Sequence, residues 1–377
     1  MTKLAVALGC AAMVSAGLAA PSQAADQSTL AVYGDAPYGT AAFSATPGFV
    51  DSVNADPDVG LVVHAGDIHS GSQNCTQTYD QSVFDLWTSF EDPLVYTPGD
   101  NEWTDCHKVG EGGGQYNPAT GKIDYVWTDG AKGAPVDYAK GNPVANLDLV
   151  RSIFFPLAGQ TIGGSPRAVT SQALWDGTEY VENVMWEQSD TLFVTLNLPG
   201  GSNNDADPWY KTPTASNQQL NEVKHRTAAD LSWIDAAFAR AADDEVGAVV
   251  IVEQADMWDL DGKAPSHIVN YEQFITKIAD KTTAFAKPVL LFNGDSHVYR
   301  SDNPLVDNAP CTTETGACSD DAYDNHPGIA TNVPNFHRVV VHGNTLPLEW
   351  LKLSITPGVD NGTSATTFGP FSWERMN

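Results

Sequence analysis

The chain has 377 residues, of which 47 are acidic and 19 basic, giving a formal charge of −28 at pH 7. A surface this acidic repels polyanions, so we expect no nucleic-acid partner. Hydrophobic residues make up 42% of the chain and ten residues are tryptophan, which excludes general disorder and provides for a sizeable core. Because no low-complexity linker or internal repeat interrupts it, we expect a single domain over residues 25–377.

The N-terminal segment has the pattern of a secretory signal peptide. Lys3 precedes an apolar run, and Ala24 ends a small-x-small cleavage pattern. We therefore expect residues 1–24 to be removed and the protein to be exported, either to a periplasm or to the medium. Cys10 raises the alternative of a lipid anchor, but the residues before it lack the leucine of that pattern. No later run reaches about 18 apolar residues, so we expect no membrane span.

Four short stretches of the chain share one pattern, in which an apolar or β-branched run stops at a Gly followed at once by an Asp. Each run is typical of a buried strand in an α/β sheet, and the Asp then projects from the carboxyl end of the strand. Ligands bind at that edge of open α/β sheets. Carboxylates gathered there need a cation to hold them, which predicts a metal-centred active site. The residues concerned are Asp35, Asp67, Asp100 and Asp295, with His297 beside the last.

The order of these motifs resembles the calcineurin-like metallophosphoesterases, which include the purple acid phosphatases. Their motifs are Asp, Gly-Asp, Gly-Asn-His-Glu/Asp, a lone His, and Gly-His-x-His. The resemblance implies a two-sheet β-sandwich flanked by α-helices, an α/β fold in α-β-β-α layers, with one or two divalent metal ions. The matching stretches here are Asp35, Gly66-Asp67, Gly99-Asp100-Asn101-Glu102 and Gly294-Asp295-Ser296-His297.

Several of the family's histidines are replaced in this chain. No His follows Asp35 at the first motif, Asp100 takes the place of an Asn ligand, and Asn101 takes that of a proposed general acid. A strand-like run leads to Gln254 where the family has a ligand His, and Asp295 replaces the first His of the last motif. Mapped residue by residue, the resemblance implies one metal held by Asp35, Asp67 and His297, and a second held by Asp67, Asp100, Gln254 and Asp295.

These replacements change the metal that we expect. Imidazole suits zinc and iron, whereas carboxylate and amide oxygens suit magnesium, calcium and manganese. Exchanging imidazoles for oxygen donors therefore favours Mg²⁺, Mn²⁺ or Ca²⁺ over a zinc or iron pair. A decayed, metal-free site is the alternative, but the replacements keep metal-capable oxygens, so we interpret the site as altered rather than lost.

Several residues near the motifs are candidates for catalysis or substrate binding. Asn101 stands at the family's acid position, and His107 could supply the proton that Asn101 cannot, unless it is an ordinary surface histidine. Arg300 could bind phosphate oxygens bidentately, or form a salt bridge with Asp302. Further candidates for substrate contact, or simply for a turn after a strand, are Asn203 and Asn204.

The cysteines indicate disulfides. Removal of Cys10 with the signal peptide leaves four cysteines, and an even number in an exported protein favours pairing. Cys311 and Cys318 close a short polar loop. Cys75 and Cys106 each follow a motif Asp, so a bridge between them would brace the metal site. A structural zinc site is the alternative, but its CxxC spacing is absent.

Hydrophobic patterning places the remaining elements. Residues 106–146 are rich in Gly and hold few apolar runs, so we expect a long irregular insertion there, a kind of loop that is often functional. Helical spacing appears at 81–90 and 227–242. Strands are expected at 29–33, 60–64, 94–96, 191–198, 246–252, 288–292, 338–342 and 350–355.

Two functions follow from these patterns. The first is an exported, metal-dependent hydrolase of small phosphoesters, in which cations activate water and polarise the phosphoryl group. The second is a catalytically weak or inactive protein of the same fold that binds calcium. The retained motif acids and His297 favour the first, while the replaced histidines favour the second. The oligomeric state is not indicated by the sequence.

Overall fold

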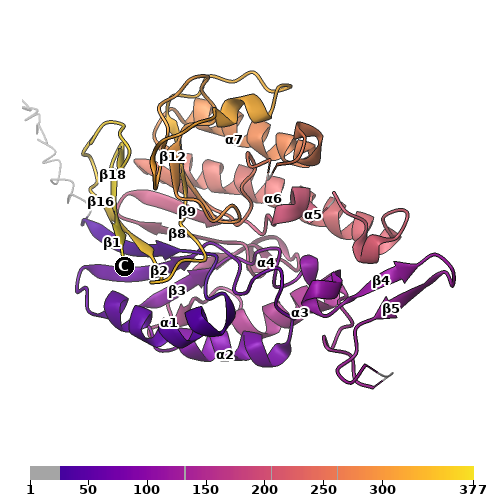
Figure 1. Ribbon diagram of the computed structural model, residues 1–377. Coiled ribbons are helices and arrows are strands. Elements are labelled where there is room, and N and C mark those ends of the chain that lie inside the picture. The colour runs from indigo at the N-terminus through magenta and orange to yellow at the C-terminus, as the bar shows by residue number, and fades with distance from the viewer. Residues whose placement is uncertain (1–25, 131–132, 205, 261) are drawn as a thin grey trace, which may run out of the picture.

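The structure is a computed structural model that describes residues 26–130, 133–204, 206–260 and 262–377. The expected signal peptide, residues 1–24, lies outside the described residues. The described chain forms two large β-sheets that stack face to face, with helices against both outer faces (Figure 1). This mixed α/β architecture confirms the fold class expected from the sequence.

The first sheet has seven strands in the order β17-β18-β16-β1-β2-β3-β6. Its central strands β1, β2 and β3 run parallel, and β16 pairs antiparallel with β1. Helices α1 (Gly39–Asn54), α2 (Gln77–Trp87) and α3 (Pro143–Phe154) cover its outer face. The strands are β1 (Ser28–Tyr33), β2 (Val59–His64), β3 (Pro93–Tyr96), β6 (Ile162–Gly163), β16 (Trp350–Ile355), β17 (Thr367–Phe368) and β18 (Phe371–Met376).

The second sheet has nine strands in the order β14-β13-β12-β15-β11-β10-β9-β8-β7. Strands β9, β10, β11 and β15 run parallel to one another. Helices α6 (Asn217–Asp243) and α7 (Glu272–Phe285) cover its outer face. The strands are β7 (Thr170–Ser171), β8 (Val184–Gln188), β9 (Thr191–Thr195), β10 (Ala248–Val252), β11 (Val289–Asn293), β12 (Arg300–Asp302), β13 (Thr312–Thr313), β14 (Gly316–Ala317) and β15 (Phe336–Val340).

The alternation of side chains along each strand produces the layers. In β1, Leu30 and Val32 point into the core between the sheets, whereas Ala31 and Tyr33 point towards the helices of the first sheet. Both sets are apolar because the central strands are covered on both faces. This explains why the strands read as continuous apolar runs in the sequence.

Several elements differ from the sequence expectations. Helix α1 was not expected because Gly39, Pro47 and Gly48 lower its helix propensity, yet its apolar face packs on the sheet. Helix α7 and strand β8 were also missed, and α6 is much longer than expected. The insertion 106–146 is not uniformly irregular. It contains the hairpin β4 (Gly114–Asn117) and β5 (Lys122–Tyr125), which projects from the body of the protein (Figure 1).

Both expected disulfides are present. Cys75 pairs with Cys106 and Cys311 with Cys318, with Cα–Cα distances of 5.7 and 5.4 Å. The pairing is confirmed, and it is compatible with an exported protein. In the part of the chain that the structure describes, no helix combines the length and apolarity needed to cross a bilayer.

Candidate metal centre

The motif acids lie at the carboxyl ends of parallel strands from both sheets. Asp35, Asp67 and Asp100 follow β1, β2 and β3 of the first sheet, whereas Asp295 follows β11 of the second. Their ligand atoms form two groups in which every atom lies within 4.8 Å of the others. The groups are Asp35, Asp67 and His297, and Asp67, Asp100 and Asp295. The structure thus brings the expected residues together, and Asp67 belongs to both groups.

At these turns the acids adopt the left-handed conformation, whereas most of the glycines before them do not. Asp35, Asp67 and Asp295 have φ angles of 48°, 59° and 74°, and His297 has a φ of 62°. Such conformations cost of order 1–3 kcal/mol each and gather at functional sites. Of the motif glycines, Gly66 has a positive φ.

The motif glycines are needed because backbone and carboxylates approach closely. A Cβ on Gly99 would lie 2.0 Å from Oδ1 of Asp67, and a Cβ on Gly294 would lie 2.5 Å from Oδ2 of Asp35. Any side chain at either position would displace the carboxylate. The Gly-Asp pairs therefore interlock, with the Gly of one loop making room for the Asp of another.

Tyr38 is a member of the cluster that the sequence reasoning missed. Its hydroxyl donates to Oδ2 of Asp67 at 3.1 Å and lies 3.3 Å from both Oδ1 of Asp35 and Nε2 of His297. The His297 ring packs edge-on against the Tyr38 ring, with 5.2 Å between centroids. No motif signals Tyr38, since only the fold places it over a residue 259 positions away.

Gln254 and Asn101 face the shared carboxylate with their amide nitrogens. Nε2 of Gln254 donates to Oδ2 of Asp67 at 3.1 Å and to Oδ1 of Asp100 at 2.9 Å. Nδ2 of Asn101 donates to the same Oδ2 of Asp67 at 2.9 Å. Oε1 of Gln254 accepts from the backbone N–H of Gly200 at 2.6 Å. The structure therefore presents Gln254 as a hydrogen-bond donor to the acids and not, as expected, as an oxygen ligand.

Glu102 ties the second and third motif loops together. It is buried and accepts from the hydroxyl of Tyr96 at 2.5 Å and from the backbone N–H of Gly99 at 2.6 Å. The backbone N–H of Asp67 donates to the same oxygen at 3.2 Å. The disulfide Cys75–Cys106 links the same two loops further out. Both devices hold Asp67 and Asp100 in place from outside the cluster.

The crowding of carboxyl groups affects their protonation. Burial raises the pKa of Asp67 well above its usual value, and the charges of Asp100 and Glu102 raise it further. Burial likewise raises the pKa of Asp35 and of Asp295. Burial lowers the pKa of His297, so its ring is neutral and able to bind a cation. Because a cation binds the ionised form of a carboxyl group, cation binding would oppose these raised pKa values.

A cavity of about 370 Å³ opens over the cluster. Its lining residues include Asp100, Asp295 and His297. A second cavity of about 620 Å³ adjoins it and shares the lining residues His107, Lys108 and Asp207. The lysines that line the two cavities are Lys108, Lys211 and Lys263, and their charge is opposite to that of the cluster.

His107 lines the cavity, as expected of a catalytic residue, but its ring is not protonated at neutral pH. Burial lowers its pKa to about 4, and Nδ1 accepts from the backbone N–H of Tyr210 at 3.0 Å. Its neighbour Asp105 also lines the cavity, and burial together with Asp100 raises the pKa of Asp105 to about 6. The sequence held no signal for the place of Asp105 in this lining.

Arg300 was expected to bind phosphate, but its guanidinium is held in ion pairs with two aspartates. Its guanidinium donates to Oδ2 of Asp302 at 2.6 Å and to the carboxylate of Asp320 at 3.1 Å. The alternative salt bridge with Asp302 is therefore what the structure contains. Asp302 in turn binds the buried Arg338, which also contacts Asp256 next to the last motif. Arg300 thus belongs to a structural ion-pair network at the edge of the second sheet.

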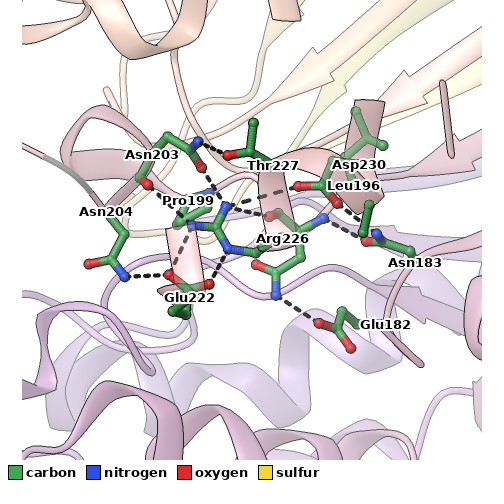
Figure 2. Close-up of polar contacts among 12 residues, drawn as sticks. Glu182, Asn183, Leu196, Pro199, Asn203, Asn204, Glu222, Arg226, Thr227 and Asp230 are labelled. Carbon is green, nitrogen blue, oxygen red and sulfur yellow. Dashed lines mark hydrogen bonds and ion pairs between the residues drawn. The ribbon is translucent and has the colours of Figure 1, made fainter. Parts of the chain in front are cut away.

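Asn203 and Asn204 belong to a left-handed turn, and Figure 2 shows the hydrogen bonds that hold their side chains. Residues 201–204 have φ angles of 57–63°. The buried Arg226 of α6 donates to the side chain of Asn203 and, at 3.1 Å, to its carbonyl oxygen. Asn203 donates to Thr227 at 2.8 Å, and Asn204 donates to Glu222 at 2.9 Å. Both amides are committed to holding the turn that lines the cavity, so neither offers a free group to substrate.

No family model matches the sequence, and no curated protein matches it. Among solved structures, the chain is similar to purple acid phosphatase PPD1 from yellow lupin (Lupinus luteus) seeds, at 11% identity and a TM-score of 0.41. That match covers 88% of this chain but 50% of the lupin protein, so the chain spans half the length of that phosphatase. It is also similar to GAP50, the anchor in the inner membrane complex of Plasmodium, at 9% identity and a TM-score of 0.41, over 93% of this chain and 89% of that one. Identities this low do not establish an activity.

Proposed function

We propose that this protein is an exported, metal-dependent hydrolase of small phosphoesters. The observation that carries the proposal is the spacing of donor atoms around Tyr38. Its hydroxyl oxygen, Oδ1 of Asp35 and Nε2 of His297 lie 3.3–3.5 Å from one another, and Oδ2 of Asp67 lies 3.1 Å from the hydroxyl. Ligand atoms about 2.1 Å from a shared cation lie about 3.0–3.4 Å apart. These residues therefore fit a small divalent cation.

The electrostatics of Asp35 support the same conclusion. Its side chain is fully buried, and Oδ2 has no hydrogen-bond donor among the residues that the structure describes. A buried carboxylate needs compensation by a proton, a donor or a cation. A divalent cation would supply that compensation, and when bound it would polarise a phosphoryl group and activate water. Mg²⁺ and Mn²⁺ suit a set of oxygen donors with one imidazole.

The cavity over the cluster is lined by two lysines and six aspartates, so an anionic substrate would depend on a bound cation to offset the acidic charge. Lys263 and His267 are exposed and line the cavity over the cluster, while Lys211 lines the adjoining one. Of these residues, the two lysines carry the positive charge that would attract a phosphate group. The volume of about 370 Å³ suits a small phosphoester rather than a polymer.

The role that we assign to Asp105 is that of proton donor to the leaving group. When ionised, Asp105 pairs with Lys108, and below its pKa of about 6 it carries the proton that it would donate. His107 would then shape the cavity wall, with the proton on Nε2 because Nδ1 accepts from Tyr210.

The competing function is calcium binding without turnover. The group Asp67, Asp100 and Asp295 offers oxygen donors alone, as Ca²⁺ prefers. The experiment measures turnover of an aryl phosphate monoester and diester with Mg²⁺, Mn²⁺ or Ca²⁺, alongside the melting temperature with each ion. Turnover with Mg²⁺ or Mn²⁺ that a chelator abolishes is the expected result. Stabilisation by Ca²⁺ with no turnover in any metal would establish the competing function instead.

A further inference from the structure

We propose that the centre holds one cation and that the amide of Gln254 takes the place of a second. The inference rests on the metal dependence proposed above, and it concerns how many ions the cluster accepts. Asp67 and Asp100 are the two acids that a second ion would bridge. Nε2 of Gln254 already lies between them, 3.1 Å from Oδ2 of Asp67 and 2.9 Å from Oδ1 of Asp100. Each N–H of the amide thus satisfies one carboxylate.

The orientation of this amide is fixed by its surroundings. Oε1 of Gln254 accepts from the backbone N–H of Gly200 at 2.6 Å, so a flipped amide would place its NH₂ against another donor. The Gln254 side chain is fully buried, and its Cβ and Cγ press against Gly66, where a Cβ would lie 2.5 Å from both atoms. Gly200 is also confined, because a Cβ there would lie 2.7 Å from Oδ2 of Asp100. Gln254 therefore has no room to rotate its oxygen toward the acids.

A cation and this amide compete for the same carboxylate oxygens. A cation shared by Asp67 and Asp100 would face the hydrogens of the amide rather than a lone pair, which is repulsive. Beside Tyr38, Nδ2 of Asn101 donates to Oδ2 of Asp67 at 2.9 Å and to the Tyr38 hydroxyl at 3.4 Å, but Oδ2 of Asp35 has no donor among the residues that the structure describes. The Tyr38 hydroxyl can rotate to present its oxygen, and Nε2 of His297 lies 3.3 Å from that oxygen and 3.5 Å from Oδ1 of Asp35. The two positions therefore differ in their acids: beside Tyr38 a buried oxygen of Asp35 still lacks a partner, whereas the amide of Gln254 already serves both Asp67 and Asp100.

The test counts bound cations in the wild type, in Gln254→Glu and in Gln218→Glu. Glu at 254 has the same shape, can still accept from Gly200, and replaces the donor with a carboxylate oxygen. Gln218→Glu adds the same charge at an exposed position of α6, so it controls for net charge. Each protein is stripped with chelator, equilibrated with Mn²⁺ and analysed by elemental analysis, titration calorimetry and electron paramagnetic resonance, which detects coupling between neighbouring Mn²⁺ ions.

We expect one Mn²⁺ in the wild type and in Gln218→Glu, and two coupled ions in Gln254→Glu. Two ions in the wild type would overturn the inference and leave the proposed hydrolase intact. One ion in both wild type and Gln254→Glu would show that Gln254 is not what excludes the second. No bound ion in the wild type would overturn the proposed metal dependence together with the inference. A wild-type count of two ions, or of none, overturns the inference even if the Gln254→Glu protein folds poorly.

Discussion

The backbone N–H of Asp295 donates to Oδ1 of Asp35 at 3.0 Å, although 260 positions separate the two residues in the chain. Asp35 ends a strand of the first sheet and Asp295 ends a strand of the second. This bond therefore joins the two sheets at the edge where the acids gather. It makes Asp35 both a candidate ligand and a structural acceptor, so variants at the cluster change stability as well as cation binding.

Replacing Asp67 with Asn is expected to weaken cation binding and reduce turnover by orders of magnitude, because Asp67 belongs to both ligand groups. The structure adds a cost in the cation-free protein. Oδ1 of Asp67 accepts from the backbone N–H of Asn101 at 3.1 Å while Oδ2 accepts from three side chains, so one face of an Asn must oppose a donor. The expected loss is about 1–3 kcal/mol in the free energy of unfolding. Thermal melts with and without Mn²⁺ measure both effects.

The control for this variant is Asp280→Asn, at an exposed position of α7. It removes the same charge and should leave the cation-induced rise in melting temperature unchanged. Equal turnover and equal metal stabilisation in Asp67→Asn and wild type would remove the centre of the proposed function.

Asp105→Asn and His107→Gln are expected to have different pH–rate profiles. Because burial raises the pKa of Asp105 to about 6, its protonated form is present below that pH and is lost as pH rises through it. The wild-type rate should therefore fall on the alkaline side of this pKa, and Asp105→Asn should lower kcat about 100-fold and abolish this limb. His107, with a pKa lowered to about 4, should lose only a fewfold in rate and keep the limb when replaced by Gln. The opposite pattern would assign the proton to His107.

Removing the disulfide Cys75–Cys106 by a double change to Ser should cost about 3.5 kcal/mol, from the entropy of its 31-residue separation. It should also weaken cation binding, because the bridge joins the loops that carry Asp67 and Asp100. The matched control is the double change of Cys311 and Cys318, whose separation of 7 residues predicts a loss of about 2.5 kcal/mol. That pair lies outside the motif loops and should leave the Kd for Mn²⁺ as in wild type.

Acid should destabilise the fold through buried histidines. Nε2 of His64 donates to the carbonyl of Ala36 at 2.9 Å and Nδ1 accepts from Gly66 at 3.2 Å, so the neutral ring is fully used. Burial lowers the pKa of His64 to about 3 and that of His337 to about 4, against about 6.5 in the unfolded chain. Their contribution is complete above about pH 6.5 and is lost as pH falls through the lowered values, at up to about 1.4 kcal/mol per pH unit for each ring.

Urea melts between pH 7 and 4 measure this slope. His337→Phe keeps an aromatic ring against Phe368 and cannot take up a proton, so its acid slope should be shallower than that of wild type. His225→Phe, at an exposed position of α6, should leave the slope unchanged. Equal slopes in all three proteins would contradict the role of His337.

Arg226→Met should destabilise the protein by about 3–5 kcal/mol, since it leaves the buried Asp230 and the turn at Asn203 without their cation (Figure 2). Because that turn lines the cavity, KM should rise more than kcat falls. Arg240→Met breaks an exposed ion pair on the same helix and should cost at most about 1 kcal/mol. Chemical denaturation and steady-state kinetics on both variants check the difference.

The sequence by itself determined the central parallel strands of both sheets and the acids that follow four of them, because a buried parallel strand is a local run of apolar residues and these four runs are closed by Gly-Asp. It also indicated the disulfide pairs, since each could be related to a loop or motif nearby in the chain. Helix α1 was not predicted, because its glycines and its proline disfavour a helix. Packing against the sheet stabilises the helix despite them.

Only the tertiary structure decided what each side chain does at the cluster. Sequence spacing could not show that Asp295 belongs to a different sheet from Asp35, that Tyr38 completes the donor set, or that Asp105 lines the cavity. Sequence reasoning also assigned roles that the structure does not support. Each of these side chains has the chemistry for its expected role, but its hydrogen-bonding groups are engaged elsewhere; they are Gln254, Arg300 and Asn203. Hydrogen-bond partners depend on angles and distances between segments far apart in the chain, and these are properties of the packed fold rather than of any local pattern.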